Sequence, residues 1–460
     1  MRLEREDIPL MTEGLDLNAV EVAALAAFSG ADTELRTSEI MERVEPKVSR
    51  QYLIRHLGDL VDKGLLAKEG AGPKVRYVLD EEGLTNAYFA VDPLLRADKP
   101  FDMGIIRDYE PNVSRLMPED MARELRKVSD ASIKAGDTIN RVVFRRYMVD
   151  FAWASSRMEG NTYTLIETHA LLDEGEPAQD RSEGEAQMLR NHADAIEYVI
   201  DNARDLRITP MELRGIHAML SRGLLSNPDD EGRIRRSIVE IGRSVYRPAS
   251  MPQVLEEGLA LIADRAREIR DPFEQSLFLL VQLSYLQPFI DVNKRTARVA
   301  ANIPLLKAGL CPLSFYGMDE DAYVEGLLAW YELNTPTRIA RTYREGYRAA
   351  AERYRSYGSR LSDNIGSAGD GERRRTAELV TQYLRAVVAG ATGPDEKDRF
   401  LRTRIEGGDP MRRDTMLVAA SKAIDHLDEV SAMGMGVSKS LLKAYRRAVE
   451  AYEGEDPGPR

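Results

Sequence analysis

The sequence predicts a mostly α-helical protein of several domains. Apolar residues recur at helical spacing along nearly the whole chain, and strand-like patterns are confined to two short segments. The chain has 460 residues, which is long enough for about three domains of roughly 150 residues each. Its composition, with 43% hydrophobic and 30% charged residues, is typical of a folded globular protein.

Composition also excludes several classes of protein. The chain carries 64 Lys and Arg against 76 Asp and Glu, so its net charge of −12 argues against a general polyanion binder. Its single cysteine, Cys311, excludes an internal disulfide and a Cys-based zinc site. No run of 18 apolar residues occurs, and the N-terminus lacks the apolar core of a signal peptide. We therefore expect a cytoplasmic protein with no membrane partner.

Residues 1–80 predict a small domain of three helices and two short strands. Helical spacing covers 17–28, 38–44 and 50–64, and Ser49 and Gly64 are suited to cap and end the third helix. Residues 65–80 then alternate around a Gly-Pro turn, as a hairpin does. This order resembles a winged helix-turn-helix.

Charge within this domain favours DNA binding. Residues 1–46 carry 4 basic and 11 acidic side chains, whereas residues 47–77 carry 7 basic and 3 acidic ones. The positive charge therefore gathers on the third helix and the wing, where phosphates and base edges would lie. The residues expected at that surface are Arg50, Gln51, Arg55, Lys74 and Arg76. A protein-interaction module is the alternative.

The rest of the chain predicts three further segments. Residues 81–130 contain four prolines and form a connector, and dense, long helical patterns follow from 131 to 355. Residues 361–372, rich in Ser, Gly and Asp, predict a break. A small helical domain is expected at 373–452.

Chemistry is concentrated in the segment QPFIDVNKRTAR, which lies between two helices that are apolar nearly all round. Its five polar residues of interest fall within eight positions: Asp291, Asn293, Lys294, Arg295 and Arg298. A loop that leads into a helix N-terminus favours phosphate, and two arginines three apart can fork onto it. A carboxylate beside the phosphates can bind Mg²⁺. The alternative is a solvated turn with ordinary end charges.

This segment resembles the signature loop of the Fic family, His-x-Phe-x-(Asp/Glu)-Gly-Asn-(Gly/Lys)-Arg-x-x-Arg, through Phe289 and the five residues above. SSRMEG resembles the family's inhibitory motif through Ser155, Glu159 and Gly160, on a helix near 147–160. EGRIRRSIVEIGRSVYRP resembles its β-hairpin flap, with Ile238, Val239 and Ile241 along the strand. The likeness covers roughly residues 105–355, and the Fic domain is placed at 131–355.

The resemblance implies transfer of AMP from ATP to a protein hydroxyl, with ATP and Mg²⁺ as cofactors. Asp291 would hold Mg²⁺, while Asn293, Lys294 and Arg295 would bind the nucleotide and Arg298 the γ-phosphate. Glu159 would pair with Arg298 and so inhibit the enzyme. The partner would be a protein target held by the flap, or a second copy of the chain, and the protein could form a homo-oligomer.

The sequence departs from the family pattern at two positions. Gln287 stands where the family has its general-base histidine, and a carboxamide cannot take a proton near neutral pH. Val292 stands where most members have glycine, and valine resists positive φ. Lys294 is also found in the Doc branch, whose members phosphorylate, so the transferred group stays open.

Three functions remain open from the sequence. The first is an autoinhibited adenylyltransferase that is impaired or inactive at Gln287, that is, a pseudoenzyme. The second is a non-catalytic regulator that senses ATP and binds DNA. The third is a hydrolase that removes AMP with Glu159 as its base. Elsewhere, His217 reads as a core residue, and Tyr323 and Tyr331 as lining either an adenine pocket or the core.

Overall fold

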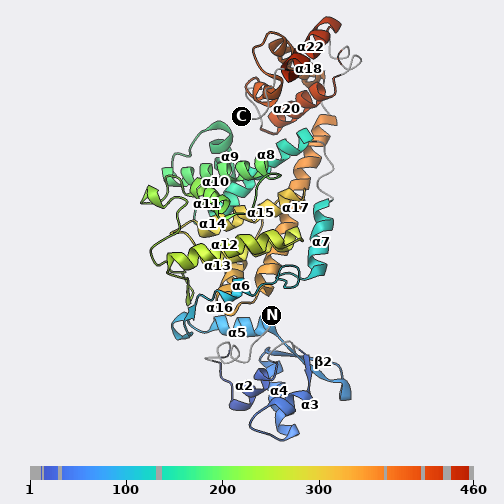
Figure 1. The fold of residues 1–460 in the computed structure, drawn as a ribbon. Coiled ribbons are helices and arrows are strands. Elements are labelled where there is room, and N and C mark those ends of the chain that lie inside the picture. Colours follow the sequence, from blue (N-terminus) through green and yellow to red (C-terminus); the bar gives the residue numbers. More distant parts are fainter. Residues whose placement is uncertain are drawn as a thin grey trace. The chain divides into compact units, whose positions relative to one another are not determined.

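The structure is a computed structural model that describes residues 12, 15–28, 34–130, 137–366, 370–405, 410–427, 432 and 437–454. It is helical along most of its length, so the predicted fold class is confirmed (Figure 1). It divides into two compact units, one of residues 1–128 with 149–350 and one of residues 129–148 with 351–460. Within the described ranges, no helix has the length and apolar character needed to cross a membrane.

The N-terminal part of the first unit combines three helices with a three-stranded antiparallel sheet in the strand order β1-β3-β2. Two of the strands form the predicted hairpin, and the sequence analysis missed β1, which has three residues only. The elements are α2 (Ala19–Ala26), β1 (Glu34–Arg36), α3 (Thr37–Arg43), α4 (Arg50–Asp62), β2 (Leu66–Glu69), η1 (Gly72–Lys74) and β3 (Arg76–Leu79).

Side chains that the sequence singled out set the ends and the core of α4. Ser49 accepts a hydrogen bond from the Tyr52 backbone at 3.3 Å, which satisfies one free N–H of the first turn. Gly64 follows the helix at φ 71°, a conformation that costs glycine little. Leu53 and Leu57, one helical turn apart, are fully buried. The helical spacing thus places one apolar face of α4 in the core.

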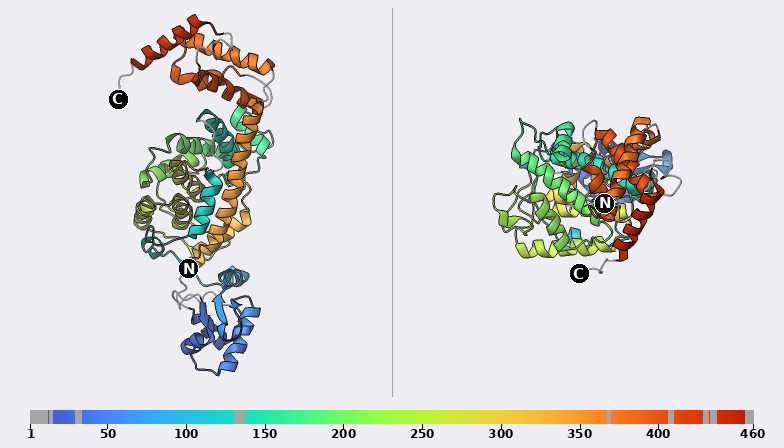
Figure 2. Two further views of the ribbon diagram at one scale, coloured as in Figure 1. Left: turned by 90° about the vertical axis from the view of Figure 1, so that its right-hand side faces the viewer. Right: turned by 90° about the horizontal axis from the view of Figure 1, so that it is seen from above.

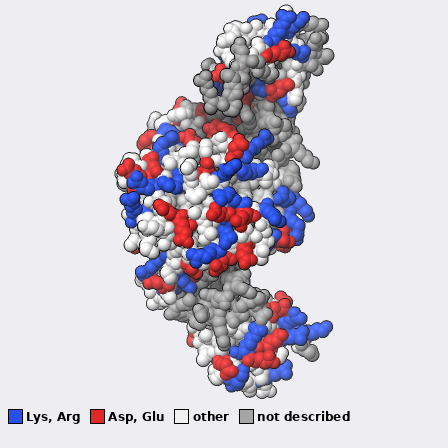
Figure 3. Space-filling model, viewed as in Figure 1, with Lys and Arg blue, Asp and Glu red and all other residues white. Residues whose placement is uncertain are grey.

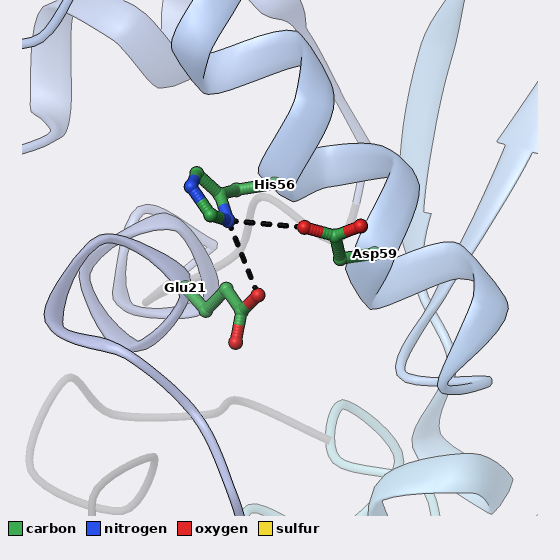
Figure 4. A group of neighbouring side chains, drawn as sticks. All are labelled: Glu21, His56 and Asp59. Atoms are coloured by element: carbon green, nitrogen blue, oxygen red, sulfur yellow. Dashed lines mark hydrogen bonds and ion pairs between the residues drawn. The ribbon is translucent and has the colours of Figure 1, made fainter.

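A buried polar cluster joins α4 to α2 (Figure 4). His56 Nδ1 lies 3.2 Å from Glu21 Oε1 and 3.1 Å from Asp59 Oδ2. Lys63 donates to the second oxygen of Glu21 at 2.8 Å, and Asn18 Nδ2 lies 3.2 Å from the same His56 nitrogen. Glu21 is buried, and a buried carboxylate is costly unless it is paired. These partners compensate its charge, and the cluster thereby fixes the two helices to one another.

The segment predicted as a connector contains several short elements. They are α5 (Glu81–Ala90), η2 (Pro93–Leu95), β4 (Lys99–Pro100), α6 (Gly104–Arg107) and α7 (Glu119–Asp130). Arg96 donates to the buried Glu332 at 2.7 Å, and so does the Tyr88 hydroxyl at 2.8 Å. The connector is therefore fixed to the helical core through one buried carboxylate.

The helical core is arranged around α13 (Pro272–Leu286), which is buried on all sides and contacts α12, α14, α15 and α16 (Figure 1). Asp271 caps α13 by accepting from Phe273 and Glu274, and Pro272 starts it. The other elements are α9 (Leu165–His169), the π-helical turn η3 (Ala170–Glu174), α10 (Glu183–Asn202), α11 (Pro210–Ser221), η4 (Pro228–Asp230), α12 (Pro252–Glu268), α14 (Asn293–Ala300), α15 (Asn302–Lys307) and α16 (Glu320–Leu333).

The segment resembling the flap differs from the predicted hairpin. Residues 231–245 are all described, and no strand pairs one arm of this segment with the other. The adjoining strand β5 (Tyr246–Arg247) instead pairs in parallel with β4. Arg235 holds this segment instead: its backbone N–H donates to the Pro288 carbonyl at 3.0 Å, and its side chain donates to the carbonyls of Ser237 and Ala249.

The second unit combines part of two long helices with a small helical group. Residues 137–148 of α8 (Asp137–Arg157) and residues 351–366 of α17 (Thr337–Gly366) belong to it. Arg146 Nε lies 2.5 Å from Asp414 within this unit. The remaining elements, red and orange in Figure 2, are α18 (Asp370–Val388), η5 (Pro394–Glu396), α19 (Lys397–Arg402), α20 (Pro410–Asp425) and α22 (Lys439–Gly454).

This arrangement differs from two predicted boundaries. Within the break predicted at 361–372, the described residues are helical, because α17 continues to Gly366 and α18 begins at Asp370, and residues 367–369 lie outside the described residues. The helix predicted near 147–160 begins ten residues earlier, at Asp137, and ends at Arg157. Polar residues at helical spacing do not by themselves stop a helix, so the composition of 361–372 did not indicate that α17 continues to Gly366.

Candidate anion-binding site

The loop between α13 and α14 begins and ends with a residue in the left-handed backbone region. Gln287 follows α13 at φ 49° and ψ 57°, and Val292 precedes α14 at φ 65° and ψ 9°. Glycine enters this region freely, whereas other residues are strained there by about 1–2 kcal/mol. The sequence analysis expected valine to resist positive φ, and the structure shows Val292 held in that conformation by its surroundings.

Asn293 and His217 hold this loop in place. The Asn293 side chain accepts from the Phe289 backbone N–H at 2.9 Å and donates to the Phe289 carbonyl at 2.8 Å. The His217 ring, on α11, stacks on the Phe289 ring with centroids 3.8 Å apart. Its Nδ1 accepts from the Gly232 N–H at 2.9 Å, so Nε2 carries the proton and donates to the Asp291 carbonyl at 3.1 Å.

Burial lowers the pKa of His217 to about 4, so the ring is neutral at pH 7. The sequence indicated a satisfied core histidine, and the ring is indeed fully buried with both nitrogens bonded. Its task in holding the loop was not predicted, because α11 lies far from the loop in sequence. Asn293, predicted as a phosphate ligand, has one amide hydrogen left after its two bonds to Phe289.

Arg235 joins the flap segment to the same loop. Its side chain is 2% exposed, and its Nε donates to the Gln287 carbonyl at 2.7 Å. Its two terminal nitrogens donate to the carbonyls of Ser237 and Ala249, the first at 2.8 Å. Sequence reasoning missed this residue, since an arginine among several others in RIRRS carries no signal of burial.

The guanidinium of Arg295 is buried and incompletely bonded. It is 5% exposed, and its nearest carboxylate oxygen is Oδ2 of Asp291, 3.9 Å from Nη2. Within the described residues, its Nε and Nη1 are buried and have no hydrogen-bond partner. Burial lowers the pKa of Arg295, although the group stays charged. Buried unpaired donors are costly, so this position favours an incoming anion.

Arg298, one turn further along α14, is fully buried and bonded to the end of α8. Its Nε donates to the Ser155 hydroxyl at 2.7 Å, and its Nη2 donates to the Ser155 carbonyl at 3.0 Å. The same Nη2 lies 2.7 Å from Glu159 Oε1, and Lys294 Nζ lies 3.3 Å from the other Glu159 oxygen. The structure therefore places Arg298, which the resemblance assigned to the γ-phosphate, in contact with Ser155 and Glu159 of the motif that resembles the inhibitory one.

Glu159 is ionised in this setting. Burial alone would raise the pKa of this carboxyl, but the charges of Arg298 and Lys294 outweigh it and lower the pKa below 4.5. Gly160 follows at φ 86°, which lets the chain turn away directly after the carboxylate. Glu159 thus occupies the Arg298 guanidinium, which the family resemblance assigned to the γ-phosphate.

Ser155 is oriented by a residue that the sequence analysis left unassigned. His192 Nε2 lies 2.8 Å from the Ser155 hydroxyl, and Nδ1 lies 3.1 Å from the Ser156 hydroxyl. Burial, together with the charges of Arg295 and Arg298, holds the pKa of His192 well below its usual value. A neutral ring accepts a hydrogen bond at one nitrogen and donates one at the other, so its contacts with the two hydroxyls hold the end of α8 in place.

A cavity of about 330 Å³ is lined by the charged side chains of Glu159, Asp291 and Lys294, whereas Arg295 and Arg298 are not among its lining residues. Val239 and Ile241 of the predicted flap line it, whereas Ile238 does not and is 74% exposed. Tyr331 contributes to its wall, but Tyr323 lies instead beside Arg298, whose guanidinium is 5.9 Å from the ring centre. The other lining residues include Gln287, Asn293, Leu327 and Leu328.

Two lining residues matter for chemistry. The side chain of Asp291 is 71% exposed, and its Oδ1 accepts from the Val292 N–H at 2.6 Å, which leaves oxygen lone pairs for a hard cation such as Mg²⁺. Gln287 donates its amide to the Ser284 carbonyl at 2.7 Å. A carboxamide in this place can hydrogen-bond but cannot act as a base.

Comparison with known families now gives the site a name. Residues 207–305 match the Fic/DOC family model, and this range includes the anion loop, α11 and the flap segment. The chain contains a Fic/DOC domain. The match covers the loop residues Gln287 to Arg298, whereas Ser155 and Glu159, of the segment that resembles the inhibitory motif, lie outside it.

Curated proteins similar to this chain are named as Fic proteins. The chain is 25% identical over 271 residues to protein adenylyltransferase fic-1 of Caenorhabditis elegans, covering 57% of this chain and 53% of the relative. It is 28% identical over 202 residues to protein adenylyltransferase Fic of Nematostella vectensis, covering 43% and 46%. The chain thus spans about half the length of these relatives.

Solved structures of Fic proteins are also similar. A Fic family protein from Desulfovibrio desulfuricans matches with a TM-score of 0.47 and 18% identity, covering 71% of this chain and 92% of that one. Fic-1 from Caenorhabditis elegans matches with a TM-score of 0.45 and 22% identity, covering 51% and 71%.

Proposed function

We propose that the Fic domain binds Mg·ATP and has the architecture of a protein adenylyltransferase that is held inactive by Glu159 and lacks its general base. The observation that carries nucleotide binding is the buried Arg295 guanidinium with two unpaired donors. Arg295, Lys294 and the remaining amide hydrogen of Asn293 would hold phosphates, and Asp291 would hold Mg²⁺. The names of the curated relatives support AMP as the transferred group.

Glu159 supports the inhibitory part of the proposal. One guanidinium cannot bind a carboxylate and a triphosphate in the same geometry, so the 2.7 Å contact with Arg298 competes with the γ-phosphate. The same contact disfavours the hydrolase alternative, because a carboxylate that two cations hold ionised is a weaker base.

Gln287 supports the impaired part of the proposal. The residue is the first of the loop after α13 and lines the cavity. At this position the family's histidine would accept a proton from the target hydroxyl. Loss of a general base typically lowers a rate by about 10²–10⁴-fold. Phosphate binding does not need that proton transfer, so ATP affinity should survive.

Calorimetric titration of the full chain with Mg·ATP tests this proposal. We expect saturable binding that Arg295→Ala weakens and that Glu159→Gly strengthens. Absence of binding to the Glu159→Gly variant would show that the loop is not a nucleotide site, since that variant frees Arg298.

A second candidate function is an ATP-sensing regulator that binds DNA. Its support is the exposure of Arg50, Gln51 and Arg55 along one side of α4, together with the exposed Lys74 and Arg76. The element order of residues 19–79 agrees with a winged helix. Figure 3 shows Lys and Arg beside Asp and Glu on the visible face of this part, and Arg76 is paired with Glu34. DNA binding measured with and without Mg·ATP tests this candidate.

A further inference from the structure

A second cavity, of about 500 Å³, lies beside the end of α8 and is distinct from the anion site. One wall is the end of α8, through Trp153 and Arg157, with Met158 directly after it, and the other is the segment 315–321, which leads into α16. This volume is within the usual range of small-ligand sites, about 300–1,000 Å³. None of its lining residues belongs to the anion cavity.

The wall of this cavity is aromatic. The rings of Trp153 and Tyr316 lie 5.8 Å apart at 45°, and the Trp153 Nε1 donates to the Tyr163 carbonyl at 2.9 Å. That hydrogen bond fixes the orientation of the indole, so one ring face is presented as a stable surface. An indole face attracts cations more strongly than the other aromatic side chains do.

The rim is acidic. Asp319, Glu320 and Asp321 line the cavity, against the single positive charge of Arg157. Acids at the N-terminus of α16 are also favoured by the helix dipole, and Asp319 caps that helix by accepting from the Ala322 N–H at 2.9 Å. Glu320 and Asp321 do not cap the helix, and the three acids together exceed the single positive charge of Arg157 at the cavity.

The chain already places a guanidinium in this setting. The Arg157 side chain lies over the Trp153 ring, with its central carbon 5.4 Å from the ring centre, and its Nε lies 3.0 Å from Glu320. Both Arg157 and Glu320 are about half exposed, so the pair is easily displaced by solvent or by a competing cation. The Arg157 side chain thus binds Trp153 and Glu320 weakly, as a ligand supplied by the chain itself.

We propose that this cavity binds a guanidinium group from outside the chain, stacked on Trp153 and paired with Glu320 in place of Arg157. A guanidinium fits better than an ammonium because it is flat and forks onto a carboxylate. The group can come from a free small molecule or from an arginine side chain of a protein segment. The acidic rim complements either source.

Tryptophan fluorescence of the full chain tests the proposal without reference to nucleotide chemistry. The chain has two tryptophans, and the other, Trp330, is 4% exposed in α16. We expect N-acetyl-L-argininamide to change the Trp153 emission saturably, and the matching lysine derivative to bind several-fold more weakly. Acetyl-Gly-Arg-Gly-amide distinguishes the sources: tighter binding of the peptide indicates a protein segment, and equal or weaker binding indicates a free molecule.

Variants make the test specific. Removing the internal competitor with Arg157→Ala should tighten binding about tenfold, with Arg157→Gln as a second variant that keeps side-chain length. Glu320→Gln should weaken binding at least about fivefold, whereas the same exchange at the exposed Glu197 of α10 should leave it unchanged. No saturable signal in wild type and in both Arg157 variants, or equal affinity of the Glu320→Gln and Glu197→Gln variants, would overturn the proposal.

Discussion

Glu159 and Arg298 lie 139 residues apart in the chain, and their side chains meet at 2.7 Å. The guanidinium is fully buried, whereas the carboxylate is 18% exposed and faces the anion cavity. A ligand can therefore reach Glu159 from the cavity, but it can reach Arg298 only by displacing Glu159. Under the proposed function, a nucleotide phosphate and the Glu159 carboxylate would therefore compete for the same guanidinium.

Replacing Glu159 should lower the thermal stability of the chain and raise its affinity for Mg·ATP. Glu159→Gly leaves the buried Arg298 without its carboxylate, and breaking such a pair typically costs about 3–5 kcal/mol. We expect a lower melting temperature without ligand and a larger upward shift on adding Mg·ATP than in wild type. Thermal unfolding followed by tryptophan fluorescence measures both, with Glu197→Gln as the control. An ATP-induced shift no larger than in wild type would contradict the inhibitory role.

His217 should make the stability of the first unit depend on pH. Its pKa falls from 6.5 in the unfolded chain to about 4 in the fold, so the unfolded chain takes up a proton first as the pH drops. The contribution is complete above pH 6.5 and is lost between 6.5 and about 4, by about 3 kcal/mol in total.

Urea unfolding at several pH values, followed by the emission of Trp153 and Trp330, checks this. Both tryptophans belong to the first unit, so the signal reports that unit alone. His217→Gln should make the profile shallower between pH 6.5 and 4, and the buried His192, whose pKa is also lowered, should account for the pH dependence that remains. The same exchange at His169, which is less buried, should alter it much less. An unchanged profile in the His217 variant would mean that its ring is not neutral in the fold.

Val292 allows a test of backbone strain. Val292→Ala and Val292→Gly both remove the buried side chain, but only glycine relieves the positive φ of 65°. We expect the glycine variant to be more stable than the alanine variant by about 1 kcal/mol, the reverse of their usual order. Matched thermal unfolding of the two variants measures the difference. The usual order, with alanine more stable, would show that the loop relaxes when the side chain is lost.

DNA binding by residues 19–79 should be electrostatic in origin. Arg50→Ala combined with Arg55→Ala removes two exposed charges from α4, and we expect weaker binding with a shallower dependence on salt. Fluorescence anisotropy with labelled duplex DNA at 50–200 mM salt, as a conventional range, measures both. Lys397→Ala in the second unit is the control. Absence of binding at low salt would favour a protein-interaction module instead.

The sequence predicted the loop and the inhibitory pair because each lies in a short, dense motif. Glu159 and Arg298 could be paired on that basis, and the structure places them in contact. Arg235 and His217 could not be found in this way, because each acts through backbone carbonyls that only the folded chain brings near. The flap differed for a related reason: an alternating pattern favours an extended chain, whereas strand pairing also needs a partner of suitable register.

Catalysis gives the most demanding prediction, because it depends on Gln287 and Glu159 together. The unmodified chain should show little self-labelling with radiolabelled ATP, since Gln287 cannot take a hydroxyl proton. Gln287→His alone should label weakly, because Glu159 still holds Arg298. Gln287→His combined with Glu159→Gly should label at least about a hundredfold faster than Glu159→Gly alone, which is the matched control with the inhibition removed and the base still missing.

The order of the four rates decides between the functions proposed above. A silent double variant that still binds Mg·ATP would leave Val292 or the wider site unsuited to transfer, and the ATP-sensing regulator would then be favoured. Strong labelling by the unmodified chain would show that Gln287 is not limiting. In that case the proton must leave through another group at the cavity, and Glu240, which also lines it, would be the first to replace.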